Sequence, residues 1–145
     1  MITVQTNDFS VADEYQRLLT ANTTGAVVIF TGLVREFSGP NTPMGIQHYP
    51  GMTESVLEKI EKEAQRRWPL LETRIIHRVG ELAVNEQIVF VGVSSAHRKA
   101  AFEACEYMID VLKTQAPFWK KEGGEWVDAK DTDQRAADAW LSDKP

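Results

Sequence analysis

Apolar residues recur at two different periods along the chain, and these periods predict where helices and strands form. A spacing of three to four residues predicts helices after Ser10 and after Thr53, and a short helix over residues 134–141. Ser10 and Thr53 are expected to cap their helices, because a hydroxyl oxygen can accept a hydrogen bond from an unpaired backbone N–H at a helix start.

The longest helical pattern begins at Ser94 or Ser95. It is expected to run to about Gln115, because Pro117 disfavours helical geometry in the residue before it. Its apolar stripe consists of Phe102, Cys105, Met108 or Ile109, and Leu112. Since Cys105 lies inside this stripe, we interpret it as a small buried side chain rather than as a nucleophile.

Runs of β-branched residues predict the strands. The continuous apolar run at residues 26–31 predicts a strand that is buried on both faces. Further strands are expected over residues 46–49, 73–79, 87–94 and 126–129. The polar, glycine- and proline-containing residues 32–45 predict a mobile loop. Helices and strands alternate irregularly, which favours an α+β fold over a doubly wound parallel sheet.

Composition narrows the class of protein. The 145 residues suit a single domain over residues 1–145. With 16 basic and 21 acidic residues, the net charge is −5, which argues against binding nucleic acid through a broad basic face. The single cysteine suits a reducing compartment. Since no signal peptide and no apolar run of membrane-helix length is visible, we expect a cytoplasmic protein.

Candidate chemistry gathers near the two ends of the long helix. His97 and Arg98 fall in its first turn, where the helix dipole disfavours cations unless an anion such as phosphate binds there. Alternatively, both are solvated or paired with glutamates. Lys113 falls in the last turn, where a cation suits the dipole.

Lys120 and Lys121 follow the aromatic pair at residues 118–119. A lysine desolvated by such neighbours has a lowered pKa and can transfer protons, although a surface loop with extended lysines explains the same pattern. Arg35 directly follows the apolar strand, at the edge of the polar loop, and such positions often carry ligands.

The histidines His48 and His77 have no partner at a metal-binding spacing, so we interpret them as structural or surface residues. No metal site and no cofactor are expected.

Five segments match one known family, in that family's order. They are Gly25–Arg35, His48–Glu54, Ile76–Leu82, Ile88–Arg98 and Lys113–Glu122. On these segments the chain resembles the large, catalytic subunit of molybdopterin synthase. The resemblance implies an α+β fold, namely an α/β-hammerhead-type domain with a mixed or antiparallel sheet and a long central helix.

The resemblance also implies an activity and partners. The family is a sulfurtransferase that converts cyclic pyranopterin monophosphate, or precursor Z, to molybdopterin in molybdenum cofactor biosynthesis. The sulfur comes from the C-terminal Gly-Gly thiocarboxylate of a small ubiquitin-like sulfur-carrier subunit. The implied assembly is a heterotetramer, in which a homodimer of this chain carries one small subunit at each end. No nucleic acid or membrane partner is implied.

Carried over by position, the resemblance implies that Lys113 and Lys120 are catalytic. The substrate-binding residues that it implies are Leu33, Val34, Arg35, His97, Arg98, Lys121 and Glu122. Leu33 departs from family members that have a lysine there, so we expect it to contribute backbone or packing. Our hypothesis is that Lys120 holds the thiocarboxylate and its developing oxyanion, while Lys113 acts as general acid and base at the pterin side chain.

One geometric consequence follows from the long helix. His97 and Lys113 are 16 residues apart, which is about 24 Å along a helix that rises ~1.5 Å per residue. A pterin cannot touch both residues within one chain. Either the helix breaks or the site is composite, and we predict that His97 and Arg98 act in trans, across a homodimer.

The sequence leaves two alternatives open. The chain could be a non-catalytic binding module for a ubiquitin-like tail or a phosphorylated ligand, in which the lysines only dock a carboxylate. It could also be an unrelated dimer that binds a phosphate ligand. Formation of a dithiolene pterin distinguishes the enzyme from both.

Overall fold

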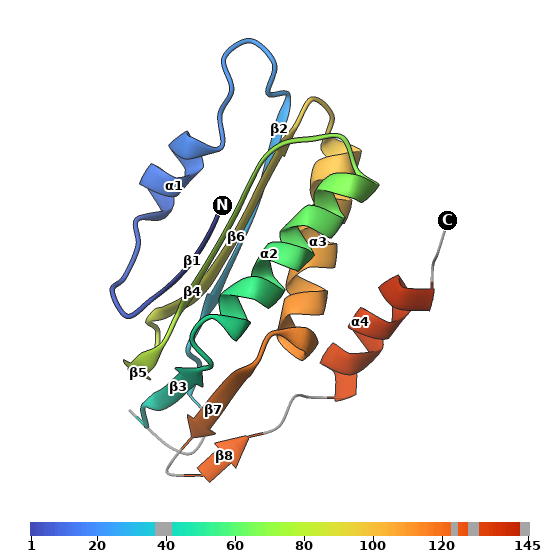
Figure 1. Ribbon diagram of the computed structural model, residues 1–145. Coiled ribbons are helices and arrows are strands. Elements are labelled where there is room, and N and C mark those ends of the chain that lie inside the picture. The colour runs from blue at the N-terminus through green and yellow to red at the C-terminus, as the bar shows by residue number, and fades with distance from the viewer. Residues whose placement is uncertain (37–41, 123–124, 128–130, 143–145) are drawn as a thin grey trace.

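The computed structural model describes residues 1–36, 42–122, 125–127 and 131–142. These residues build two sheets of four strands each, together with four helices (Figure 1). The larger sheet forms the middle layer of the molecule, and the smaller sheet lies at one end of it (Figure 1).

The larger sheet is mixed. In spatial order its strands are β1 (Ile2–Gln5), β4 (Leu70–Arg78), β6 (Gln87–Ser95) and β2 (Ala26–Leu33). β1 runs parallel to β4, whereas β4 and β2 both pair antiparallel with β6. The strands predicted at residues 73–79 and 87–94 are thus confirmed as β4 and β6, and both are buried over most of their length.

β2 forms one edge of this sheet, next to β6. The strand predicted at residues 26–31 is confirmed, but its predicted burial on both faces is wrong, because its side chains are only half-buried. The reason is its position, since no other strand in the described part of the chain pairs with its outer edge.

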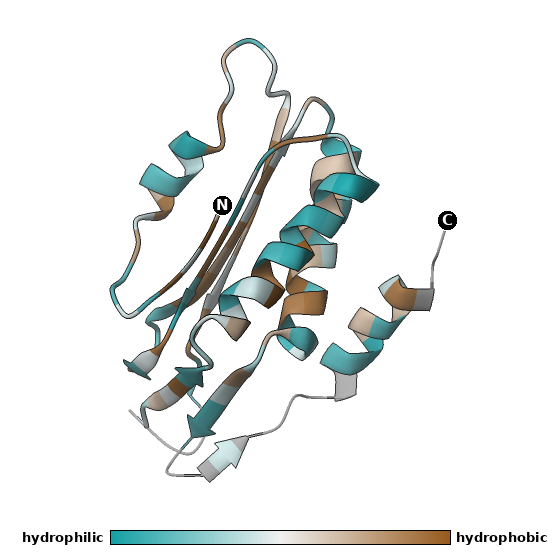
Figure 2. Ribbon diagram, in the orientation of Figure 1, coloured by the Kyte–Doolittle hydropathy of each residue, from teal (hydrophilic) through white to brown (hydrophobic). Residues whose placement is uncertain are grey.

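Helices cover both faces of the larger sheet. α2 (Met52–Arg67) and α3 (Arg98–Gln115) pack side by side on one face, and the short α1 (Val11–Arg17) lies on the other (Figure 1). α4 (Asp131–Ser142) packs against α3. Apolar residues fill the strands beneath α2 and α3, while polar residues follow the outward side of α2 (Figure 2). The main core therefore lies between this helix pair and the sheet.

Of the caps predicted for the first two helices, one is confirmed and one is wrong. Ser10 caps α1, since its Oγ accepts a hydrogen bond from the Asp13 N–H. Thr53 does not cap α2, which begins at Met52 after Gly51. Instead, the Thr53 hydroxyl accepts from the Tyr49 N–H and donates to the carbonyl of residue 117, which ties α2 to the chain after α3.

The long helix differs from its prediction in two details. Ser94 and Ser95 belong to β6, so neither caps α3, and its N-cap residue is His97, which makes no side-chain capping bond. Cys105 lies on the buried face as predicted, but Phe102 is 61% exposed and does not belong to that stripe. The helix is unbroken over 18 residues and ends at Gln115.

The smaller sheet brings together segments that are far apart in sequence. Its strands, in spatial order, are β5 (Gly80–Leu82), β3 (Met44–His48), β7 (Phe118–Glu122) and β8 (Glu125–Val127). β3 and β8 correspond to the strands predicted at residues 46–49 and 126–129, whereas β1, β5 and β7 were not predicted. Pairing of β3 with β7 places Ile46 opposite Lys120.

The predicted α+β class, with a mixed sheet and a long central helix, is confirmed. Within the described residues, no helix is both long and apolar enough to cross a membrane. The loop predicted at residues 32–45 lies partly outside the described residues, which omit 37–41. The helix predicted at residues 134–141 is confirmed as part of α4.

Candidate active site

A cavity of about 410 Å³ lies where the ends of α3 and β2 meet the smaller sheet. Its apolar walls include Phe30, Leu112 and Phe118. Its charged and titratable lining residues are Arg35, His77, Lys113, Lys120, Glu122 and Asp133. Three basic side chains therefore face two carboxylates, and this balance favours an anionic ligand.

The strand β7 supplies one wall of the cavity. Side chains alternate between the faces of a strand, so Phe118, Lys120 and Glu122 line the cavity while Trp119 and Lys121 point away from it. Lys121 instead places its Nζ 5.6 Å from the ring centroid of Trp126. The structure thus brings Lys120 and Glu122 to the cavity and does not bring Lys121 there.

Lys113 enters the cavity from the last turn of α3. The partial negative charge of the helix C-terminus favours a cation at this position. Arg35 and Leu33 reach the same cavity from the end of β2. Val34 lies between them but is buried, and its backbone N–H and C=O pair with Glu86 and Asn85, so it acts here through packing.

His97 and Arg98 lie at the opposite end of α3 from Lys113, and both are exposed. Since the helix is continuous, about 24 Å separates its two ends at ~1.5 Å per residue. The cavity of one chain therefore does not contain the predicted pair, and the alternative of a broken helix is excluded.

His77 was interpreted as structural or surface, but it lines the cavity and is only 3% exposed. Its ring stacks on Phe118, with 3.7 Å between ring centroids. Burial, opposed by a hydrogen bond to the backbone of Arg78 and reinforced by the nearby charges of Lys120 and Lys113, lowers the pKa of His77 to about 3. The imidazole is therefore neutral at physiological pH.

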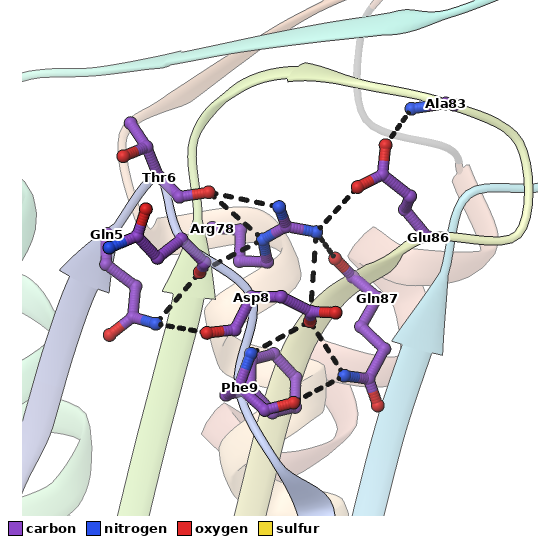
Figure 3. Close-up of polar contacts among 9 residues, drawn as sticks. Gln5, Thr6, Asp8, Phe9, Arg78, Ala83, Glu86 and Gln87 are labelled. Atoms are coloured by element: carbon purple, nitrogen blue, oxygen red, sulfur yellow. Dashed lines mark hydrogen bonds and ion pairs between the residues drawn. The ribbon is translucent and has the colours of Figure 1, made fainter.

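The backbone that carries His77 is held by a polar network around the next residue (Figure 3). The buried Arg78 guanidinium donates hydrogen bonds to the carbonyls of Thr6, Asn7 and Gln87 and to the Glu86 carboxylate, and it forms an ion pair with Asp8 at 3.9 Å. These contacts tie β4 to β6 and to the segment after β1. Because neighbouring side chains on a strand face opposite sides, the network lies across the sheet from the cavity.

The only cysteine in the sequence takes no part in this cavity. Cys105 is buried, and its Sγ donates to the Val91 carbonyl at 3.6 Å. Burial raises the pKa of its thiol to about 12, so the reactive thiolate is scarce. A sulfur-handling reaction at this site would need its sulfur from a ligand.

Sequence reasoning missed several lining residues, among them Phe30, Met44, His77, Phe118 and Asp133. The first lies in the run that predicted a buried strand, and its neighbours Thr31 and Gly32 also line the cavity. Alternation along β7 would have found Phe118, had residues 118–122 been recognised as a strand.

The mixed α+β fold holds a cavity lined by basic side chains, as suits a domain that binds a small anion. The chain belongs to the MoaE protein family, whose model matches residues 4–115. It is 51% identical to the molybdopterin synthase catalytic subunit of Vibrio cholerae over 145 residues, covering 96% of this chain and 97% of that protein.

Solved structures agree with this assignment. The molybdopterin biosynthesis MoaE protein from Burkholderia ambifaria is 48% identical, covers 96% of each chain and superposes with a TM-score of 0.83. The molybdopterin synthase structure from Staphylococcus aureus is 34% identical, covers 86% of this chain and 95% of that chain, and gives a TM-score of 0.80.

Proposed function

We propose that this chain is the catalytic subunit of a molybdopterin synthase. In this role it transfers sulfur to cyclic pyranopterin monophosphate from the C-terminal thiocarboxylate of a small ubiquitin-like subunit, and the product is molybdopterin. The observation that carries the proposal is the meeting of Lys113 and Lys120 in one cavity of a MoaE-family chain.

The two lysines suit separate parts of the reaction. The thiocarboxylate is an anion that is already nucleophilic, so the protein needs no cysteine of its own, in keeping with the inert Cys105. Lys120 binds the incoming thiocarboxylate, whose sulfur bonds to the pterin to form a thioester. Water then attacks the acyl carbon of this thioester, and Lys120 stabilises the oxyanion that develops before the acyl–sulfur bond breaks. The sulfur stays on the pterin, and the small subunit leaves with a C-terminal carboxylate. Lys113 acts as general acid and base at the pterin side chain, where oxygens leave as carbon–sulfur bonds form.

The phosphate of the substrate calls for donors beyond the two lysines. Arg35 supplies one at the cavity rim. His97 and Arg98 supply others only if they come from a second chain, because the unbroken α3 keeps them away from the cavity of their own chain. We therefore place them in the site of the partner copy in a homodimer.

The sheet edge offers a way to build this composite site. α3 runs antiparallel to β6 and hence in the direction of β2, so the start of β2 lies near His97 and its end lies near Lys113. If two copies paired antiparallel through their β2 edges, the start of one α3 would approach the end of the other. Pairing would also cover the half-buried apolar strand that the single chain leaves at the edge.

Hydrogen exchange tests this arrangement. In a dimer joined through β2, the backbone amides of residues 26–33 that do not point toward β6 should exchange slowly with solvent. After dilution to the monomer, the same amides should exchange faster. Fast exchange of these amides in a confirmed dimer would place the dimer interface elsewhere.

The proposed assembly is a homodimer with one small subunit at each end, located in the cytoplasm. A reducing location suits the unpaired Cys105. The deciding experiment incubates the purified chain with cyclic pyranopterin monophosphate and thiocarboxylated partner, and measures the dithiolene pterin that forms. Binding of the partner without any product would instead indicate a non-catalytic binding module.

A further inference from the structure

While they are protonated, the basic side chains of the cavity can only donate hydrogen bonds. Lys113, Lys120 and Arg35 carry N–H groups and no acceptor. They can bind a phosphate or a thiocarboxylate, but they cannot bind an N–H group of a ligand. A pterin ring and the peptide tail of a sulfur carrier both present such N–H donors. The cavity therefore also needs acceptors, and besides the carboxylates of Glu122 and Asp133 its lining holds a neutral candidate, the ring of His77.

The ring of His77 has a tautomer set by its surroundings. Its Nδ1 lies 2.8 Å from the Arg78 carbonyl oxygen. A carbonyl can only accept, so Nδ1 carries the hydrogen and Nε2 of the neutral ring keeps a bare lone pair. The network around the Arg78 guanidinium fixes that carbonyl by holding its residue from several sides (Figure 3).

The position of Nε2 follows from the contacts of the ring. Among the described residues, the Arg78 carbonyl is the only hydrogen-bond partner of the His77 ring. His77 lines the cavity, and since its Nδ1 is engaged by the Arg78 carbonyl, Nε2 is the ring nitrogen left to meet a ligand there. The stack on Phe118, at an interplanar angle of 17°, keeps the ring from turning.

From these contacts we infer that His77 is a binding and specificity residue, whose Nε2 accepts a hydrogen bond from an N–H group of the bound ligand. This inference rests on the proposed function, since the ligand is then the pterin or the tail of the sulfur carrier. The neutral ring carries no positive charge and does not attract the anionic groups of the ligand, which the lysines bind. His77 instead favours ligands that present an N–H group to Nε2.

Three substitutions separate the acceptor from the rest of the side chain. His77→Asn keeps an N–H that can donate to the Arg78 carbonyl, but it lacks an acceptor at the Nε2 position. His77→Gln places an amide oxygen near the Nε2 position. His77→Phe keeps only the stack on Phe118. His48→Asn makes the same chemical change at a histidine outside the cavity lining, and it serves as the matched control.

Steady-state turnover is measured with the complete assembly, varying the pterin and the thiocarboxylated partner in turn. We expect His77→Asn and His77→Phe to raise KM for one of the two substrates about tenfold, with kcat within about twofold of the unsubstituted chain. His77→Gln should recover most of that loss, and His48→Asn should match the unsubstituted chain. The substrate whose KM rises is the one that supplies the N–H group.

Unchanged KM values in His77→Asn, or an equal rise in His48→Asn, would overturn the inference. So would a loss of kcat alone, which would indicate a structural or catalytic effect instead. If the unsubstituted chain forms no product, it is the proposed function that fails, and the two failures are thereby distinguished.

A second measurement does not depend on the variants folding. Nitrogen-15 NMR of the His77 ring in the free protein at pH 7 should show Nδ1 protonated and Nε2 bare, and the Nε2 resonance should shift when ligand is added. A proton on Nε2, or no response of Nε2 to a ligand that binds, would contradict the inference.

Discussion

The two ends of α3 carry the same kind of charge in opposite surroundings. At its C-terminus, Lys113 meets the partial negative charge of the helix and lines a cavity. At its N-terminus, Arg98 and His97 are exposed next to the partial positive charge, no side chain caps the helix, and its first turn contains no acidic residue. The first end is stabilised within one chain, and the second is not.

This difference indicates that an anion binds at the N-terminus of α3, next to His97 and Arg98. Two potential cations at a helix N-terminus are unfavourable unless an anion binds beside them. In one chain the cation-lined cavity lies at the other end of the helix, and the proposed homodimer joins that cavity to the N-terminus of the partner's helix.

The largest effect is expected at the cavity end. Lys113→Ala and Lys120→Ala should each lower turnover about 10²- to 10⁴-fold, because each removes proton transfer or charge stabilisation from the reaction. Single-turnover formation of the dithiolene pterin measures the loss. Lys62→Ala, which changes an exposed lysine on α2, should leave turnover within about twofold and provides the matched control.

Turnover of Lys113→Ala close to that of Lys62→Ala would refute the assignment of Lys113 as acid and base. Lys121→Ala adds a second comparison on the same strand, since Lys121 lies on the face of β7 that points away from the cavity of its own chain. We expect its effect to be at least tenfold smaller than that of Lys120→Ala.

The next effect links the two ends across the dimer. His97→Ala and Lys113→Ala should each be nearly inactive alone. In a heterodimer of these two chains, one composite site contains both unsubstituted residues and the other contains neither. Random mixing makes about half of the dimers heterodimers, so activity should return to about a quarter of that of the unsubstituted protein.

Native mass spectrometry confirms that heterodimers have formed before activity is measured. A mixture that contains heterodimers but stays inactive would show that His97 and Lys113 act within the same chain or at separate sites.

How much of this contrast could be predicted from sequence depends on how local each feature is. The long helix, and hence the separation of His97 from Lys113, follows from an apolar period and a proline, and both signals lie within 20 or so residues. The strands β4 and β6 follow in the same way from β-branched runs. These elements form the core, and their apolar residues are spaced in sequence so that they face it.

The cavity could not be predicted in this way, because it depends on pairing between distant segments. β7 has two adjacent aromatic residues followed by two lysines, which hides the alternation of a strand, and its pairing with β3 spans about 70 residues. His77 lies in a run that reads only as a buried strand. Its stack on Phe118 exists only once β7 has been placed, so no local signal marks it as a cavity residue.

A smaller effect concerns stability, and it uses the neutral His77. The native pKa is lowered to about 3, while the unfolded chain should protonate this residue near 6.5. The unfolded state therefore binds more protons between these values, so the contribution of His77 to stability is complete above pH 6.5 and is lost as the pH falls toward 3. The loss reaches up to about 5 kcal/mol.

Denaturant unfolding of the unsubstituted chain and of His77→Phe, at several pH values between 4.5 and 7.5, measures this dependence. The difference in free energy of unfolding between the two chains should shift in favour of His77→Phe as the pH falls, since the phenylalanine cannot be protonated. A difference that stays constant over this range would mean that the native pKa of His77 is not lowered.

The smallest effect is expected in the middle of α3, between the two charged ends. Cys105→Ala should leave turnover within about twofold, because the proposed donor brings its own sulfur and Cys105 does not line the cavity. The native thiol should also resist iodoacetamide at pH 8, since burial raises its pKa to about 12. Phe102→Cys supplies the matched control, because it places a thiol at a 61% exposed position one turn earlier on the same helix. Peptide mapping of that variant should find the alkyl group at position 102 and not at 105. Equal alkylation at both positions would show that the middle of α3 opens readily, and the helix could then no longer be treated as a rigid spacer between its two ends.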